Sequence, residues 1–269
     1  MGGKTKIDWC DSTWNPVTGC RHGCRYCYAR SIAKRFCGYN IDPVGDSITV
    51  YDARVSNPII ELDNQLSKVD RKGQVRPAVY PFGFTPTLHR YTLDQPSKWC
   101  KPRTIFVCSM ADLFGSWIPD EWITEVFNAC MAAPQHRYLF LTKNPKRYID
   151  LATKGLLPVK HDNFWFGSTT TTPETEFFWH DNLNTFVSIE PILAPFKGLV
   201  DDGIYPTSKT NWIIIGAETG NHKNKNVPEK AWIEEIVSTA KKAGIPVFMK
   251  ESLRDIMGDD FIQQSPWEV

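Results

Sequence analysis

Apolar and polar positions alternate in a regular way over the second half of the chain. Short apolar runs bounded by polar residues are typical of buried strands, and they are separated by segments with a helical repeat. This pattern favours a parallel sheet whose strands are joined by helices. The predicted strands cover residues 103–109, 138–142, 164–168, 186–190, 212–216 and 246–250.

The helices between these strands are predicted from their end signals and apolar faces. Pro119 begins a helix over 119–131 with two acids in its first turn, the usual placing of both residue types. Further helices are predicted over 143–151 and over 228–243, the latter capped by Gly244. In the first helix one face carries Trp122, Val126, Phe127 and Cys130, and in the last one the inward side chains are Trp232, Ile233, Ile236, Val237 and Ala240.

Before residue 103 the pattern is looser. We expect strands over 15–19 and 83–88, helices over 28–36 and 59–69, and an irregular insertion at about 40–80. With roughly eight strands, the chain is predicted to be α/β: a full or partial (β/α) barrel forming a single domain over 1–269. An open doubly wound sheet is the alternative, although no Gly-x-Gly-x-x-Gly or Walker loop follows any predicted strand.

Composition narrows the class of protein. The chain has 269 residues, of which 42% are hydrophobic and 23% charged, which excludes an intrinsically disordered or fibrous chain. No apolar run approaches the ~20 residues of a membrane span, and no leader is seen, so we expect a cytoplasmic protein without membrane contact. The net charge of +1 means that any binding of nucleic acid depends on a local basic patch.

Eight cysteines are many for a cytoplasmic protein, where disulfides are rare. Cys108 and Cys130 lie in apolar patterns and are predicted to be core residues; Cys10, Cys37 and Cys100 receive no assignment. The other three lie within eight residues, spaced Cys-x3-Cys-x2-Cys. They are Cys20, Cys24 and Cys27.

Three closely spaced thiolates are typical ligands of an iron–sulfur cluster or of zinc. A cubane cluster has four irons, so three cysteines leave one iron open for chemistry. The alternative is a structural zinc site of the Cys3His type that includes His22, which lies within the same loop.

The spacing, with the aromatic Tyr26 directly before the third cysteine, resembles the signature of the radical S-adenosylmethionine superfamily. The resemblance is closest to a phage-associated branch of unsettled function, and it extends over most of the chain. The segments that carry it are residues 13–20, 109–114, 134–143, 188–191 and 216–220.

The resemblance implies a barrel with the iron–sulfur loop after its first strand, in which Cys20, Cys24 and Cys27 bind a [4Fe–4S] cluster. It further implies that the open iron chelates S-adenosylmethionine. An electron from a donor such as flavodoxin or ferredoxin would cleave the cofactor to methionine and a 5′-deoxyadenosyl radical, which abstracts a substrate hydrogen.

Polar residues follow most of the predicted strands, where a β/α barrel carries its site. Glu190 and Glu218 are the strongest candidates and would hold the methionyl ammonium or a ribose hydroxyl. Lys143 or Lys250 would pair with the cofactor carboxylate or a substrate phosphate. The alternative is that these are solvated strand ends. The full set of candidate cofactor-binding residues is Ser109, Asp112, Lys143, Ser168, Glu190, Glu218 and Lys250.

Residues 12–41 contain no acid, and aromatic residues alternate there with basic ones. Such a segment is typical of a surface that contacts phosphates and stacks on bases. The alternative, which the composition favours equally, is that the basic residues offset the charge of an anionic cluster. We therefore expect a radical enzyme acting on a nucleobase in DNA, RNA or a nucleotide. The alternatives are action on a peptide or amino acid, or a zinc- or cluster-stabilised nucleic-acid-binding protein without turnover. The basic residues are Arg21, Arg25, Arg30, Lys34 and Arg35.

Overall fold

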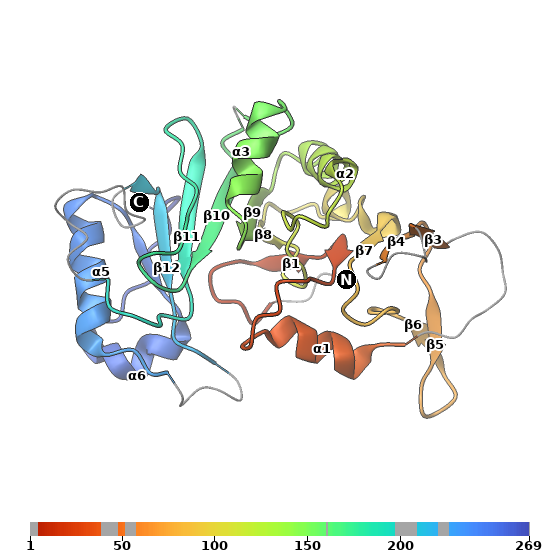
Figure 1. The fold of residues 1–269 in the computed structure, drawn as a ribbon, viewed down its shortest axis with the longest axis horizontal. Helices are drawn as coiled ribbons and strands as arrows, with labels where there is room; N and C mark the ends of the chain where they lie inside the picture. The colour runs from red at the N-terminus through yellow and green to blue at the C-terminus, as the bar shows by residue number, and fades with distance from the viewer. Residues whose placement is uncertain are drawn as a thin grey trace. The chain divides into compact units, whose positions relative to one another are not determined.

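The computed structural model describes residues 5–38, 48–51, 58–159, 161–196, 209–219 and 226–268. The expected insertion at about 40–80 lies partly outside these residues. The chain divides into two compact units (Figure 1). The first is made of residues 1–3 and 12–136, and the second of residues 4–11 and 137–269.

The first unit combines a parallel strand pair with a small mixed sheet. The pair is β1 (Ser12–Trp14) beside β8 (Thr104–Val107). The mixed sheet has the order β2 (Val17–Thr18), β7 (Thr87–His89), β4 (Ile59–Leu62) and β3 (Ile48–Tyr51). A hairpin is formed by β5 (Ser67–Val69) and β6 (Val75–Pro77). The helices are α1 (Tyr28–Phe36), η1 (Arg90–Thr92), η2 (Pro96–Lys98) and α2 (Asp120–Met131).

Three expectations for this unit were wrong. Residues 59–69 form no helix: Ile60 and Leu62 lie in β4, which pairs with strands on both sides, and residues 67–69 form β5. Tertiary pairing of β-branched residues outweighed the helical spacing. The strand expected over 15–19 is reduced to β2 at Val17–Thr18, and β1 at Ser12–Trp14 was not predicted. Of residues 83–88, only Thr87 and Leu88 lie in a strand, β7.

Helix α2 follows the prediction closely. Pro119 is its N-cap, and Asp120 and Glu121 lie in the first turn, where carboxylates favour the positive end of the helix dipole. The predicted inward face is confirmed, because Trp122, Val126, Phe127 and Cys130 are all buried.

The second unit contains a five-stranded parallel sheet whose strand order follows the chain. Its strands are β9 (Arg137–Thr142), β10 (Phe164–Thr170), β11 (Asn184–Ile189), β12 (Trp212–Ile215) and β13 (Val247–Met249). Its helices are α3 (Lys146–Thr153), α5 (Lys230–Lys242), η4 (Glu251–Leu253), α6 (Arg254–Met257) and η5 (Gly258–Asp260). The predicted parallel strands are confirmed here, with helices α3 between β9 and β10 and α5 between β12 and β13, whereas residues 171–183 join β10 to β11 without a helix; β10 is two residues longer than expected.

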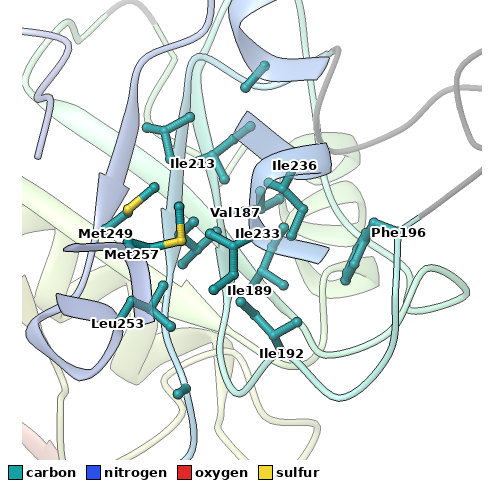
Figure 2. Close-up of a cluster of buried hydrophobic side chains, with 14 of the residues drawn as sticks. Val187, Ile189, Ile192, Phe196, Ile213, Ile233, Ile236, Met249, Leu253 and Met257 are labelled. Carbon is teal, nitrogen blue, oxygen red and sulfur yellow. The ribbon is translucent and has the colours of Figure 1, made fainter. Parts of the chain in front are cut away.

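One face of this sheet packs against α5. Figure 2 shows the cluster, in which Ile233 and Ile236 of α5 meet Val187 and Ile189 of β11 and Ile213 of β12. Side chains alternate between the two faces of a strand. The residues between these positions, such as Ser188 and Ile214, therefore lie on the opposite face.

The opposite face is aromatic over the amino-terminal half of the strands. The indole of Trp212 packs against Phe186, Phe248 and Trp165, with ring centroids 5.7, 6.1 and 6.4 Å away. Trp9, from residues 4–11, also contacts Phe186 and Trp212. These rings fill the amino-terminal end of the face, so a ligand on it would have to bind at the carboxyl ends of the strands.

Both units are therefore mixed α/β structures with parallel strands. In the described parts of the chain no helix has the length and hydropathy needed to cross a membrane.

Candidate functional site

The cysteine loop of the first unit begins at a glycine that no other residue can replace without a shift. Gly19 has φ of +86°, and a Cβ added to it would lie 2.3 Å from the carbonyl oxygen of Thr85. Only glycine adopts this conformation without strain. The backbone of Gly19 donates to Met110 O at 2.9 Å and that of Cys20 to Phe84 O at 3.3 Å. These contacts fix where the first cysteine leaves the sheet.

The segment that follows β8 holds the loop from a second side. Cys108, with φ of +60°, turns the chain at the end of the strand, a conformation that is uncommon outside glycine. The next residues then meet the cysteine loop and α1: the Tyr28 hydroxyl donates to Ser109 O at 2.8 Å. The Ser109 side chain is used within the unit, because its Oγ donates to Asn15 Oδ1 at 3.1 Å.

The three thiols are free and partly exposed. Cys27 is the N-cap of α1, and its sulfur accepts the backbone N–H of Arg30 at 3.4 Å. The pKa of Cys20 is raised to about 12, chiefly by burial and further by the charges of Asp112, Cys24 and Cys27, against a backbone hydrogen bond with His22 that lowers it.

His22 is engaged away from the thiols. Its Nε2 lies 2.6 Å from Oδ2 of the buried Asp112, and its ring meets the edge of Trp117 with centroids 4.9 Å apart. The other oxygen of Asp112 accepts the backbone N–H of Phe114 at 3.0 Å. The contact engages Nε2 of the imidazole, and a carboxylate at one ring nitrogen is also the usual partner of a histidine that ligates a metal through the other. The pair was not predicted from the sequence.

The three cysteine thiols of the loop are ligands of the chemical kind that an iron–sulfur cluster requires. In the part of the chain that the structure describes, no three His, Cys, Asp or Glu side chains already form a group able to hold a metal ion. The three cysteines nevertheless lie within eight residues of one loop, and metal binding to such thiols is coupled to the loss of their protons and to the folding of the site. Cys20, Cys24 and Cys27 are the residues that would hold the group.

The basic residues around the loop divide into two classes. Arg21 and Arg30 are engaged within the unit: Arg21 donates to Pro58 O at 3.0 Å, and the guanidinium of Arg30 lies over the ring of Phe84. Arg25, Lys34 and Arg35 are exposed. The exposed aromatic rings of Tyr28 and Phe36 lie on the same helix, and the β5–β6 hairpin adds Lys68, whose Nζ donates to Phe36 O at 2.7 Å. The hairpin also carries exposed Arg71, Lys72 and Arg76, which sequence reasoning did not connect with this surface.

In the second unit, the carboxyl ends of the strands bring Glu190 and Lys250 together. Strand register places them on either side of Gly216, and Lys250 Nζ donates to Glu190 Oε1. A Cβ on Gly216 would lie 3.0 Å from Lys250 Cδ and 3.4 Å from Glu190 Cδ. The missing side chain therefore leaves room for the ion pair.

The remaining candidates of this unit differ in their surroundings. Lys143 directly follows β9 and is partly exposed, next in register to Thr169. Glu218 is buried, with Oε2 accepting from Asn226 Nδ2 at 2.8 Å. Ser168 lies inside β10 rather than at its end, and its hydroxyl accepts the backbone N–H of Phe178 at 2.8 Å. That hydroxyl thus has a structural partner, and Thr169 stands nearer to the strand end.

The comparison with protein families gives a match over almost the whole chain. Residues 4–253 match the model of a family described as a protein of unknown function, DUF5131. The chain belongs to the DUF5131 family. The matched range includes the cysteine loop and all candidate residues of both units. No curated protein and no solved structure matches this DUF5131 member.

Proposed function

We propose that this DUF5131 protein is a radical S-adenosylmethionine enzyme with a nucleobase substrate, free or within DNA or RNA. In this proposal Cys20, Cys24 and Cys27 hold a [4Fe–4S] cluster on a full or partial (β/α) barrel, in a loop that follows the first strand. A bound cluster would supply the electron for reductive cleavage of S-adenosylmethionine.

The observation that carries the proposal is the construction of the cysteine loop. Three free thiols lie on eight residues, and the loop is fixed by Gly19 and by the segment after β8. Cys108, a non-glycine residue with a positive φ angle, has a sparsely populated backbone conformation, and such conformations are concentrated in proteins at functional sites.

Other residues of the chain support the same chemistry by their charge. Glu190 and Lys250 follow the parallel strands β11 and β13, which flank β12, and they form a partly exposed pair, which suits the ammonium and carboxylate of a methionyl group. The exposed basic and aromatic side chains of α1 suit a phosphate-bearing substrate. Among the residues that the structure describes, no contact specifically favours a peptide substrate.

Single cysteine substitutions test the proposal. Reductive cleavage of S-adenosylmethionine, followed as release of 5′-deoxyadenosine under anaerobic conditions, should be abolished in Cys20→Ala, Cys24→Ala and Cys27→Ala, because an iron loses its anchor. Cys100→Ala is the matched control, since this exposed cysteine lies in the same unit outside the loop. Cleavage that survives loss of a loop cysteine would contradict the proposal, as would a wild type that never cleaves the cofactor.

A further inference from the structure

A pocket of about 380 Å³ lies in the first unit, between the β1–β2 connection and the segment from η1 to η2. This volume is at the lower end of ligand sites, which span roughly 300–1,000 Å³. It suits a ligand of one or two rings. No sequence motif predicts this pocket, because its lining comes from four separate segments.

Three side-chain amides line the pocket, those of Asn15, Gln65 and Gln95. The oxygen of Asn15 accepts from Ser109 Oγ and from the Met110 backbone at 3.1 and 2.9 Å, which leaves its NH₂ group to donate. Amides both donate and accept, and Asn and Gln make paired hydrogen bonds to the edges of bases. The polar lining is therefore of the kind that recognises a heterocyclic edge.

Tyr80 and Tyr91 supply flat apolar surface on the same pocket. Burial raises the pKa of Tyr91 to about 12 and raises that of Tyr80 as well, so both rings are uncharged phenols at neutral pH. Aromatic rings of this kind stack on bases in sites for unpaired nucleotides.

The pocket offers no unpaired charge in the part of the chain that the structure describes. His89 is buried, and its ring nitrogens meet Thr18 Oγ1 at 2.8 Å and the Tyr91 hydroxyl at 3.1 Å. Asp94 and Lys98, the charged lining residues, form an ion pair with each other at 2.6 Å. An amino acid or a phosphate would need a charged partner here, whereas an uncharged base would not.

We propose that this pocket binds a nucleobase, carried either by a free nucleoside or by an unstacked residue of a single strand. The pocket is built into the same unit as the cysteine loop: Thr18 stands two residues before Cys20, and Tyr80 and Cys27 pack against one cluster around Ala33. The bound base is thus the substrate of the proposed enzyme, a reading that rests on the proposed function.

Binding is measured by titration calorimetry on cluster-free protein, so the result does not depend on the proposed chemistry. Adenosine, guanosine, cytidine, uridine and thymidine are the probes, with ribose and glucose as controls. At least one nucleoside should bind at submillimolar concentration while both sugars fail. A second arm uses a short single-stranded oligonucleotide of the preferred base, and tighter binding there identifies a strand as the source of the base.

Two substitutions locate the site. Val79 lines the pocket and is 52% exposed, so Val79→Trp fills the entrance without disturbing the core, and binding should weaken at least ~10-fold. Val75→Trp is the control, on β6 outside the pocket at 72% exposure. Gln95→Leu should weaken binding by roughly 5- to 150-fold, the range of one good paired contact, and Asn182→Leu, an exposed amide of the second unit, should not.

Three outcomes would overturn the inference: no nucleoside binding by the folded protein, equal binding of the sugars, or equal affinities of the Val79→Trp and Val75→Trp variants. Displacement of the nucleoside by S-adenosylmethionine would also overturn it, since the pocket would then belong to the cofactor. Cofactor cleavage without nucleoside binding would refute only the pocket. Nucleoside binding by a protein that takes up no iron in anaerobic reconstitution with iron and sulfide would refute only the proposed enzyme.

Discussion

The two units place their polar residues by different means. In the second unit, parallel strands in register bring Glu190 and Lys250 together at the carboxyl-terminal end of the sheet. None of Glu190, Gly216 and Lys250 has a positive φ angle, and the absence of a side chain at Gly216 leaves room for the pair. In the first unit, the cysteine loop depends on positive φ angles at Gly19 and Cys108. The position of side chains at the ends of strands thus follows from strand pairing, whereas the conformation of the cysteine loop depends on individual residues.

The largest expected effect distinguishes two glycines of this loop. Gly19 and Gly23 have similar φ angles, +86° and +72°, but only a Cβ on Gly19 meets backbone, at 2.3 Å from Thr85 O. Each alanine should cost about 1–2 kcal/mol for the left-handed conformation. Gly19→Ala should cost about 1–3 kcal/mol more, the usual range for overpacking. Urea unfolding of both variants measures the difference, and equal losses of stability would show that the clash does not matter.

The next effect concerns acidification. Burial lowers the pKa of His89 in the first unit to about 4 from 6.5. The unfolded chain takes up a proton on His89 below pH 6.5, and the folded chain does so only near pH 4. The contribution of His89 to the free energy of unfolding is therefore fully present above pH 6.5. It decreases as the pH falls toward 4, by about 3 kcal/mol in all.

This dependence is measured by urea unfolding between pH 7 and pH 4.5. His89→Gln should flatten the profile over that window, whereas His180→Gln, an exposed histidine of the second unit, should leave it as in the wild type. A profile that keeps its slope in His89→Gln would assign the effect to other groups.

The smallest expected effect is a loss of cofactor affinity when the carboxylates at the carboxyl-terminal ends of the strands are substituted. Glu190→Gln and Glu218→Gln each remove one charge from a hydrogen-bonded carboxylate, which usually costs ~1.5–3 kcal/mol, or roughly 10- to 150-fold in affinity. Under the proposed function, we expect S-adenosylmethionine to bind that much more weakly in equilibrium dialysis. Glu234→Gln on α5 is the exposed control. If Glu190→Gln and Glu218→Gln both bind the cofactor like the wild type, these two carboxylates have only a structural role or are merely solvated.

The same contrast explains what the sequence predicted well. In the second unit every expected strand formed, because a buried parallel strand needs only a run of apolar residues, such as Trp212–Ile215. Glu190 and Lys250 therefore lie where the predicted strands placed them, directly after β11 and β13. In the first unit, Ile60 and Leu62 were assigned to a helix, since a short apolar run does not reveal pairing with β7, which lies 25 residues later in the chain.

Site details that depend on long-range contacts were missed for the same reason. The spacing of Cys20, Cys24 and Cys27 is local and was visible, but the pairing of His22 with Asp112 joins residues 90 positions apart. Ser168 was placed at a strand end because β10 was taken to stop there, whereas the strand runs to Thr170. The glycine directly before Cys20 was a signal of backbone constraint that the sequence did offer.

The central claim is that the cysteine loop binds an iron–sulfur cluster, and metal analysis tests it most directly. Wild-type protein reconstituted anaerobically with iron and sulfide should be brown and hold about four irons and four sulfides per chain. Cys100→Ala should match it, while substitution of any loop cysteine should lower the iron content sharply. A colourless wild type that retains one tightly bound zinc per chain would contradict the account.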